Sequence, residues 1–247
     1  MKLLYIFIFY SYSTVASELR AITHNIDGEA ICKDSKCLAV SSGGKRAFYI
    51  SIFNEIMNNT GNEIPIKIYP FKRGWKYVTS KKNIIFFPVQ RIHSREERVQ
   101  WVGPIATSTD YFFGKRNNYI YPLTNKRLTK MSICILNGSS HETILLEKGF
   151  QNLHRVNYFS ICLKLLMHNR VEFILNSNDN IINMLESNNI QKEDIYNTNI
   201  ILTSKAIYIA FSNNINRDLV VKWNKVLKKI KQSGRYYKLY NKYIKNF

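Results

Sequence analysis

One segment constrains the fold of this chain more than any other: residues 84–105, which read IIFFPVQRIHSREERVQWVGPI. The apolar run at 84–89 is typical of a buried strand. It ends in a short polar loop that carries Arg91 and Arg95, and the chain turns apolar again at 101–104. Open α/β sheets bind their ligands at the carboxyl ends of strands. The order therefore predicts an α/β fold with a binding site at or near this loop.

The first 17 residues have the layout of a secretory signal peptide. A short basic start, Met1-Lys2, precedes an apolar stretch at 3–10 and a run of small and polar residues at 11–17. The apolar stretch is too short to span a bilayer, and Ala16 or Ser17 could precede the cleavage point. A buried first strand is the alternative. We expect residues 1–17 to be a signal peptide and the mature protein to be exported and soluble.

Export makes the cysteines interpretable. Cys32 and Cys37 lie in the polar segment ICKDSKC, and an oxidising compartment would let them form a disulfide. Metal binding is the alternative, but no His or second Cys pair lies nearby to complete four ligands. Cys134 and Cys162 lie in the apolar contexts SICIL and FSICLKLL. There we expect small buried thiols.

The chain is strongly basic, with 36 Lys and Arg against 17 Asp and Glu and a net charge of +19. Basic residues recur after Asp218, and no acidic residue follows it. Such a run could bind nucleic acid or an anionic membrane face. However, apolar residues recur at helical spacing across 219–230 and leave most lysines on the opposite side. We interpret the run as a solvated helix face and expect no nucleic-acid partner.

Strands and helices are expected to alternate along the chain, which favours α/β layering. Expected strands cover 64–69, 84–89, 131–136, 171–175 and 207–211. Expected helices cover 47–58, 71–78, 141–148 and 158–169, and two helices broken at Gly234 close the chain. Residues 111–130 read as polar and irregular. The strands and helices form two successive sets, and a late strand at 207–211 follows the second set. This order predicts two lobes, joined by two crossings, with a cleft between them.

The segment 84–105 resembles a signature of the extracellular solute-binding proteins of family 3, the polar amino-acid type that feeds ABC importers. The family pattern reads roughly F-P-x-x-R-T-P-x-R-E and then F-x-W-V-G-P. Matching residues here are Phe87-Pro88, Arg91, Arg95-Glu96 and Trp101-Val102-Gly103-Pro104. Similar stretches lie at 69–73, 146–153, 165–171, 208–212 and 234–243, so the resemblance covers about 45–247.

The resemblance implies the type II periplasmic-binding-protein fold, with two lobes, each a central sheet flanked by helices, and a ligand cleft between them. The first lobe is expected at 18–110 and 206–247, and the second at 111–205. The resemblance also implies a monomeric periplasmic protein that captures a small polar or anionic ligand, expected to bear a carboxylate and to be amino-acid-like. It would deliver this ligand to an ABC permease in the inner membrane. A ligand-poor descendant that acts as a sensory or envelope interaction module is the alternative.

Catalysis has little support in the sequence. The five histidines form no metal spacing, and no glycine-rich phosphate loop or G-x-S-x-G motif is present. Glu96 and Glu142 are the only acids close to the motifs, and both are typical of helix starts. We therefore expect a binding protein without a cofactor or metal, and not an enzyme.

Arg95 and the turn Gly138-Ser139-Ser140 are the leading candidates for the ligand site. The resemblance implies that Arg95 grips a ligand carboxylate, since a guanidinium can form two parallel hydrogen bonds to it. The alternative for Arg95 is an ion pair with Glu96 or Glu97. Relatives place a G-[ST]-[ST] turn from the second lobe on the same carboxylate. The turn opens a predicted helix, whose free N–H groups favour anions, although such turns are also ordinary caps.

Four further residues complete the predicted site. Arg91 and Arg73 could point into the cleft and favour an anion, or lie at the solvated surface. Phe71 could stack on a ligand or pack in the core. Ser177 stands near the position where relatives keep an acid for the ligand's α-amino group, and Asp179 could replace that acid. The family's P-P-Y start is also absent from 20–44, so the sequence does not predict a standard α-amino-acid ligand.

Overall fold

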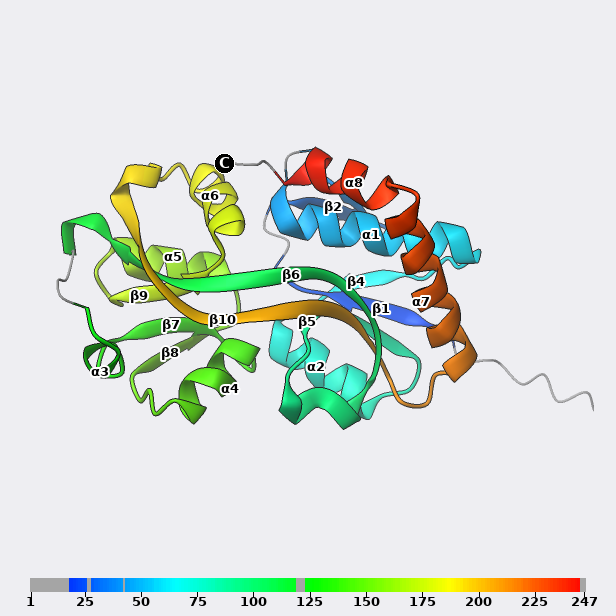
Figure 1. The fold of residues 1–247 in the computed structure, drawn as a ribbon, viewed down its shortest axis with the longest axis horizontal. Coiled ribbons are helices and arrows are strands. Elements are labelled where there is room, and N and C mark those ends of the chain that lie inside the picture. The colour runs from blue at the N-terminus through cyan, green and yellow to red at the C-terminus, as the bar shows by residue number, and fades with distance from the viewer. Residues whose placement is uncertain (1–17, 26–27, 42, 119–122, 245–247) are drawn as a thin grey trace, which may run out of the picture.

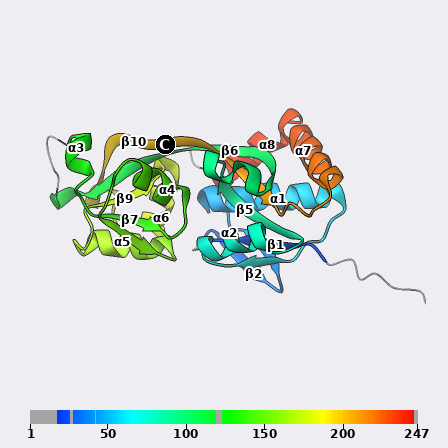
Figure 2. The same cartoon turned by 90° about the horizontal axis from the view of Figure 1, so that it is seen from below.

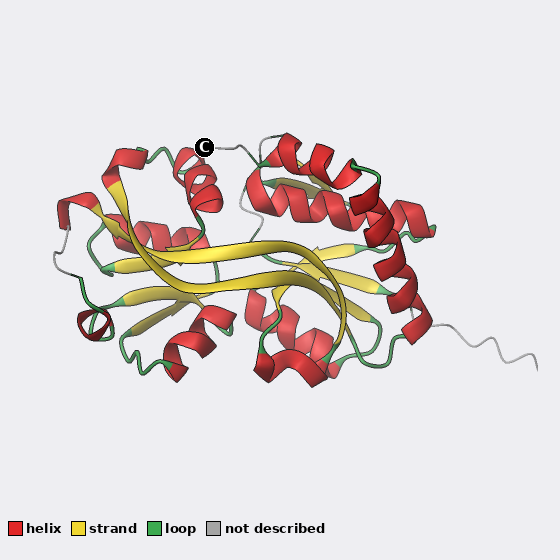
Figure 3. Ribbon diagram, in the orientation of Figure 1, coloured by secondary structure: helices red, strands yellow, loops and turns green. Residues whose placement is uncertain are grey.

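The computed structural model describes residues 18–25, 28–41, 43–118 and 123–244. The expected signal peptide at 1–17 lies outside the described residues. The chain forms a mixed eight-stranded sheet that curls through the length of the molecule, with helices packed on its faces (Figure 1, Figure 3). The α/β, two-lobed architecture predicted from the sequence is confirmed.

The strands are β1 (Arg20–Thr23), β2 (Ala30–Lys33), β3 (Lys36–Ala39), β4 (Ile66–Ile68), β5 (Ile84–Gln90), β6 (Gln100–Lys115), β7 (Ile133–Leu136), β8 (Leu153–Val156), β9 (Phe173–Asn176) and β10 (Ile195–Phe211). The α-helices are α1 (Gly44–Thr60), α2 (Phe71–Ser80), α3 (Asn125–Leu128), α4 (Ser140–Glu147), α5 (Phe159–Met167), α6 (Asn178–Ser187), α7 (Arg217–Gln232) and α8 (Arg235–Tyr243). Short 3-10 helices are η1 (His93–Arg98), η2 (Arg116–Asn118) and η3 (Lys192–Asp194).

Two long antiparallel strands, β6 and β10, run from one half of the molecule to the other (Figure 1, Figure 2). The sheet order is β4-β1-β5-β10-β6-β9-β7-β8, so these strands join the two halves into one sheet. The expectation of irregular structure at 111–130 is wrong for 111–115, which belong to β6. These five residues include Phe112 and Phe113, which are buried, and they pair with β10 and β9; the aromatic residues mark a strand before the polar stretch begins.

The apolar core is divided between the two halves of the molecule, although the sheet is continuous. Two clusters of buried side chains draw on 21–105 and 207–244, and two others draw on 112–202. In the first group, Phe87 from the signature segment stacks on Phe53 at 4.0 Å between ring centroids, and Trp223 packs edge-on against Phe53. The signature segment thus forms part of the core of the first half.

The helices α1 and α7 follow the predicted pattern. Helix α1 ends at Gly61, which has a φ of +69° and a backbone N–H that bonds to the last turn of the helix. In α7 the apolar stripe that includes Trp223 and Leu227 is buried, whereas Lys225 and Lys228 are exposed. Among the described residues, no helix combines the length and the apolar character needed to cross a membrane.

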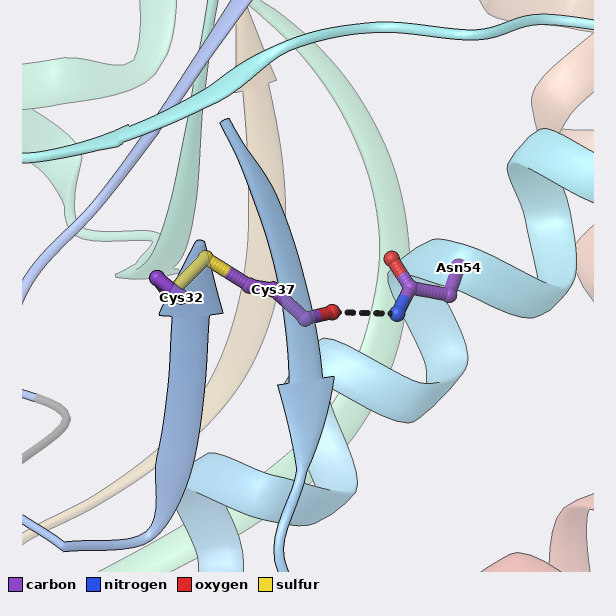
Figure 4. The surroundings of a disulfide bond; sticks show 3 residues. All are labelled: Cys32, Cys37 and Asn54. Carbon is purple, nitrogen blue, oxygen red and sulfur yellow. Dashed lines mark hydrogen bonds between the residues drawn. A yellow bond between two sulfur atoms is a disulfide. The ribbon is translucent and has the colours of Figure 1, made fainter. Parts of the chain in front are cut away.

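The first disulfide is the predicted one. Cys32 and Cys37 are directly paired across the β2–β3 hairpin and their sulfurs are bonded. The amide of Asn54 on α1 donates a hydrogen bond of 2.8 Å to the Cys37 carbonyl, as Figure 4 shows. This hydrogen bond holds the hairpin against the helix.

The expectation of two free thiols is wrong. Cys134 on β7 and Cys162 on α5 form a second disulfide, with 5.3 Å between their Cα atoms. Both residues are fully buried, as their apolar contexts predict. Their separation of 28 residues concealed the pairing, because only the packing of α5 on β7 brings the sulfurs together.

Candidate functional site

A cavity of about 120 Å³ lies where the two halves meet. This volume is small compared with the roughly 300–1,000 Å³ of drug-sized ligand pockets, which favours a small ligand. Residues from both halves line the cavity, among them His24, Lys45, Phe71 and Gln90 on one side and Ser139, Ser140 and Ser177 on the other.

Lys45 was not predicted from the sequence. Its side chain is 8% exposed, and its Nζ lies 2.8 Å from Asp179 Oδ1 and within hydrogen-bond distance of Ser177 and Ser108. Gly44, the preceding residue, has a φ of +67°, and a Cβ there would lie 2.0 Å from the Asn183 amide nitrogen. Glycine therefore lets the start of α1 approach α6. A lysine directly after Gly43-Gly44, at the positive end of a helix, was the available signal in the sequence.

Asp110 is the centre of a second polar network in the cavity. Its carboxylate accepts hydrogen bonds of 2.8 Å from Gln90 Nε2 and from Ser108 Oγ, and His141 Nε2 lies 2.8 Å from its Oδ2. Ser140 Oγ donates to Gln90 Oε1 at 2.6 Å. Burial would raise the pKa of Asp110, but the charge of His141 and the hydrogen bonds outweigh it and lower the pKa to about 2. Asp110 is thus a charged group that links the halves.

His24 forms a neutral wall of the cavity. Its Nε2 lies 3.0 Å from the Pro88 carbonyl oxygen and its Nδ1 lies 3.0 Å from the Asn25 amide nitrogen. Phe71 meets the imidazole edge-on, with 4.8 Å between ring centroids. Burial and the nearby Arg46 lower the pKa of His24 well below its ordinary value, so the ring is uncharged at neutral pH.

Arg95 is buried close to the cavity, although it lies outside the cavity lining. It is 4% exposed, and its guanidinium donates to the carbonyls of Gln90 and Gly138 at 3.3 and 3.0 Å. The guanidinium also lies 5.1 Å from the Phe71 ring centroid and 4.9 Å from that of Trp75. Burial and the charge of Arg98 lower its pKa to about 10, which leaves it charged at neutral pH.

No carboxylate of the described chain pairs with Arg95. The neighbouring Glu96 pairs with Arg91, whose Nε lies 2.7 Å from Glu96 Oε2. The alternative in which Glu96 or Glu97 neutralises Arg95 is therefore not observed in the described part of the structure. A buried positive charge that contacts only carbonyls and aromatic rings is suited to receive an anion.

The predicted turn both caps a helix and lines the cavity. Ser139 Oγ accepts a hydrogen bond of 3.4 Å from the Glu142 backbone N–H at the start of α4. The Glu142 carboxylate in turn accepts from the Gly138 N–H at 2.6 Å; this is a variant of the capping box, in which the N–H belongs to the residue before the N-cap. Ser139 and Ser140 nevertheless face the cavity. The turn meets Arg95 through the Gly138 carbonyl.

The remaining predicted residues separate into two pairs. Phe71 and Ser177 line the cavity. Arg91 and Arg73 lie outside its lining: Arg91 pairs with Glu96, and Arg73 is exposed and donates to the hydroxyl of Tyr77 at 3.0 Å. Across the described residues, no three His, Cys, Asp or Glu side chains are grouped so as to hold a metal ion.

Comparisons with known proteins give a family match and a shared fold. A family model described as bacterial extracellular solute-binding proteins, family 3, matches residues 43–246. No curated protein sequence matches the chain. Solved structures share its fold at low identity.

Three of these structures show which kinds of protein share the fold. An ancestral arginine-binding protein bound to glutamine is 18% identical, with a TM-score of 0.75, over 92% of this chain and 97% of that one. A histidine kinase sensor domain with similarity to periplasmic binding proteins is 10% identical, with a TM-score of 0.77, over 92% and 96%. The GluR0 ligand-binding core from Nostoc punctiforme, in complex with L-glutamate, is 18% identical, with a TM-score of 0.75, over 91% and 98%.

Proposed function

Because this chain belongs to the bacterial extracellular solute-binding proteins of family 3, we propose that it captures a small polar, carboxylate-bearing ligand for an ABC importer. In this proposal residues 1–17 direct export, and the mature protein is a periplasmic monomer that delivers its ligand to an inner-membrane permease. The two disulfides support an oxidising extracytoplasmic location.

The observation that carries the proposal is Arg95 beside the cavity. It is a buried charge without a carboxylate partner in the described chain, and it reaches the opposite half at Gly138. A guanidinium in such a place is costly unless an anion compensates it. A ligand carboxylate that takes the place of the Gly138 carbonyl would provide that compensation, with Ser139 and Ser140 on the opposite side.

We place the lobes of the proposed hinge at 18–110 with 206–247, and at 111–205. The division of the core clusters supports these limits, and β6 and β10 would be the two hinge crossings. The lobes meet directly through Gln90 and Ser140, and through Lys45 and Asp179. A ligand that binds both lobes would favour this closed arrangement over an open one.

A sensory role is the second candidate function. The fold shared with a histidine kinase sensor domain favours it, as does the small size of the cavity, whose polar side chains bond to one another. A permease gene and an ATPase gene beside the gene for this protein would favour transport. Fusion or linkage to a signalling gene would favour sensing.

Calorimetric titration of Arg95 variants tests the proposed binding site. Succinate, glutarate, L-aspartate and L-glutamate serve as probes, after a thermal-shift screen has identified those that bind the wild type. We expect Arg95→Ala to weaken binding by roughly 2–5 kcal/mol, because a charge-assisted pair in a closed cleft is lost. Arg95→Lys should also bind weakly, since an ammonium cannot form the bidentate pair.

Arg73→Ala is the matched control, because Arg73 is exposed and outside the cavity lining. It should bind as the wild type does. Unchanged affinity in Arg95→Ala would show that this arginine is structural, and the proposed ligand clamp would be wrong.

A further inference from the structure

The carboxylates that line the cavity are already engaged by the protein itself. Glu29 Oε2 accepts the backbone N–H of Arg46 at 2.9 Å, at the start of α1. Asp110 accepts from Gln90 and Ser108 and meets His141. Each acid therefore serves a structural contact. An ammonium group that entered the cavity would have to break one of these contacts to find a carboxylate.

Lys45 places an ammonium group in the cavity wall. Its Nζ has three acceptors, Asp179 at 2.8 Å, Ser177 at 3.2 Å and Ser108 at 3.4 Å, which match the three donors of an ammonium. Two of these acceptors belong to the opposite half of the molecule. Lys45 therefore occupies the place where a positively charged ligand group could bridge the halves.

The position of Lys45 is unfavourable on local grounds. It lies in the first turn of α1, where the helix dipole repels a cation, and it is 8% exposed. Departures from local preference concentrate at functional sites. Gly44 is required for the close approach of α1 to α6 that brings Lys45 to Asp179.

We infer that Lys45 is a specificity-determining residue, which supplies the ammonium itself and selects small carboxylates that have no ammonium group. The inference rests on the proposed function and names the substrate class of that site. An α-ammonium would meet the like charge of Lys45 and find Asp179 occupied. A simple carboxylate or dicarboxylate would instead be attracted by Lys45 and Arg95.

Matched pairs of probes that differ only by the α-ammonium test this inference. The pairs are succinate with L-aspartate and glutarate with L-glutamate, titrated calorimetrically into the full mature protein. We expect the wild type to bind the member without the ammonium at least about tenfold more tightly. Lys45→Met, which removes the charge and keeps an unbranched side chain one atom shorter, should lose this preference and bind the amino acids more tightly than the wild type does.

Asp179→Asn is a second variant. It separates two roles of Asp179: partner of Lys45, as we infer, or anchor of a ligand ammonium. If Lys45 fills the site, this variant leaves a surplus positive charge, so dicarboxylate affinity should be retained or increased and amino acids should still bind weakly. If Asp179 instead anchors a ligand ammonium, the variant should lose amino-acid binding, and our inference would be overturned. Lys225→Met, on the exposed face of α7, controls for the loss of a positive charge.

The outcomes separate this inference from the proposed function. A wild type that prefers the amino acids, with binding that depends on Arg95, would retain the proposed function and overturn the inference alone. A wild type that binds no member of either pair would overturn both. Circular dichroism of each variant confirms that the fold is intact before its affinity is compared.

Discussion

At the scale of single residues, the site is organised by charges that are held at the boundary between the halves. Lys45 and Asp110 are each less than a tenth exposed, and both bond to groups on the opposite half. Buried charges are tolerated when hydrogen bonds replace their hydration. These contacts therefore join the two halves at the cavity and also set its charges.

Asp110 predicts a specific dependence of stability on pH. Its pKa is lowered from the ordinary 3.8 to about 2, so its contribution is fully present above pH 4 and is lost as the pH falls towards 2. The shift corresponds to roughly 2 kcal/mol. Urea unfolding from pH 7 to 2 should show that Asp110→Asn loses less stability than the wild type over the acid limb.

Asp194→Asn provides the comparison, because Asp194 is exposed in η3. Between pH 4 and 2, the free energy of unfolding of this variant should fall as that of the wild type does. If Asp110→Asn and the wild type lose stability in parallel between pH 4 and 2, the network around Asp110 does not hold its carboxylate charged.

At the scale of elements, the two disulfides constrain different amounts of chain. The hairpin bridge closes a separation of 5 residues, whereas the bridge between β7 and α5 closes one of 28. Loss of chain entropy in the unfolded state grows with the length of the closed loop. Both cysteines of the second bridge are fully buried in an apolar cluster, where removal of sulfur leaves a void, whereas Cys32 of the first bridge is only partly buried.

We expect the double variant Cys134→Ala, Cys162→Ala to be destabilised more than Cys32→Ala, Cys37→Ala. The loop model gives about 3.5 kcal/mol for the former and about 2 kcal/mol for the latter. Urea unfolding of both variants under non-reducing conditions measures the difference. Equal losses, or a larger loss for the hairpin variant, would contradict the expectation.

At the scale of the whole molecule, β6 and β10 decide how the halves can move. These strands are paired with each other along most of their length, and within the described part of the chain they are the two stretches that pass between the core clusters. The register of their pairing shifts at several points, including the stretch between Asn197 and Ile201. Any change in the relative orientation of the halves must therefore be absorbed by bending or twisting of this two-stranded ribbon.

Export and oxidation can be checked on the intact protein. We expect protein recovered from the envelope to lack residues 1 to about 17 and to carry two disulfides. Residues 1–17 have the layout of a signal peptide, and both cysteine pairs are bonded. Intact mass spectrometry should show the loss of these residues and of two hydrogen atoms per bridge. A retained Met1, or cysteines that can be alkylated without reductant, would contradict this prediction.

The fold class and most elements could be predicted from the sequence, and the sequence also suggested several residues of the candidate site. The apolar run at 84–89, the stop at Gly61 and the apolar stripe of α7 are local patterns, and local patterns report strands, helix ends and buried faces. The signature segment also pointed to Arg95, which is buried and, among the described residues, has no carboxylate partner.

Contacts between residues that are distant in the sequence could be identified only in the folded chain. The pairing of Cys134 with Cys162 depends on how α5 packs on β7, and the contact of Lys45 with Asp179 depends on the approach of α1 to α6. A sequence pattern of period 2 or 3.6 shows which face of an element is buried, but it does not show which element covers that face. The cavity is formed by such covering contacts, so its charges could be identified only after the chain had folded.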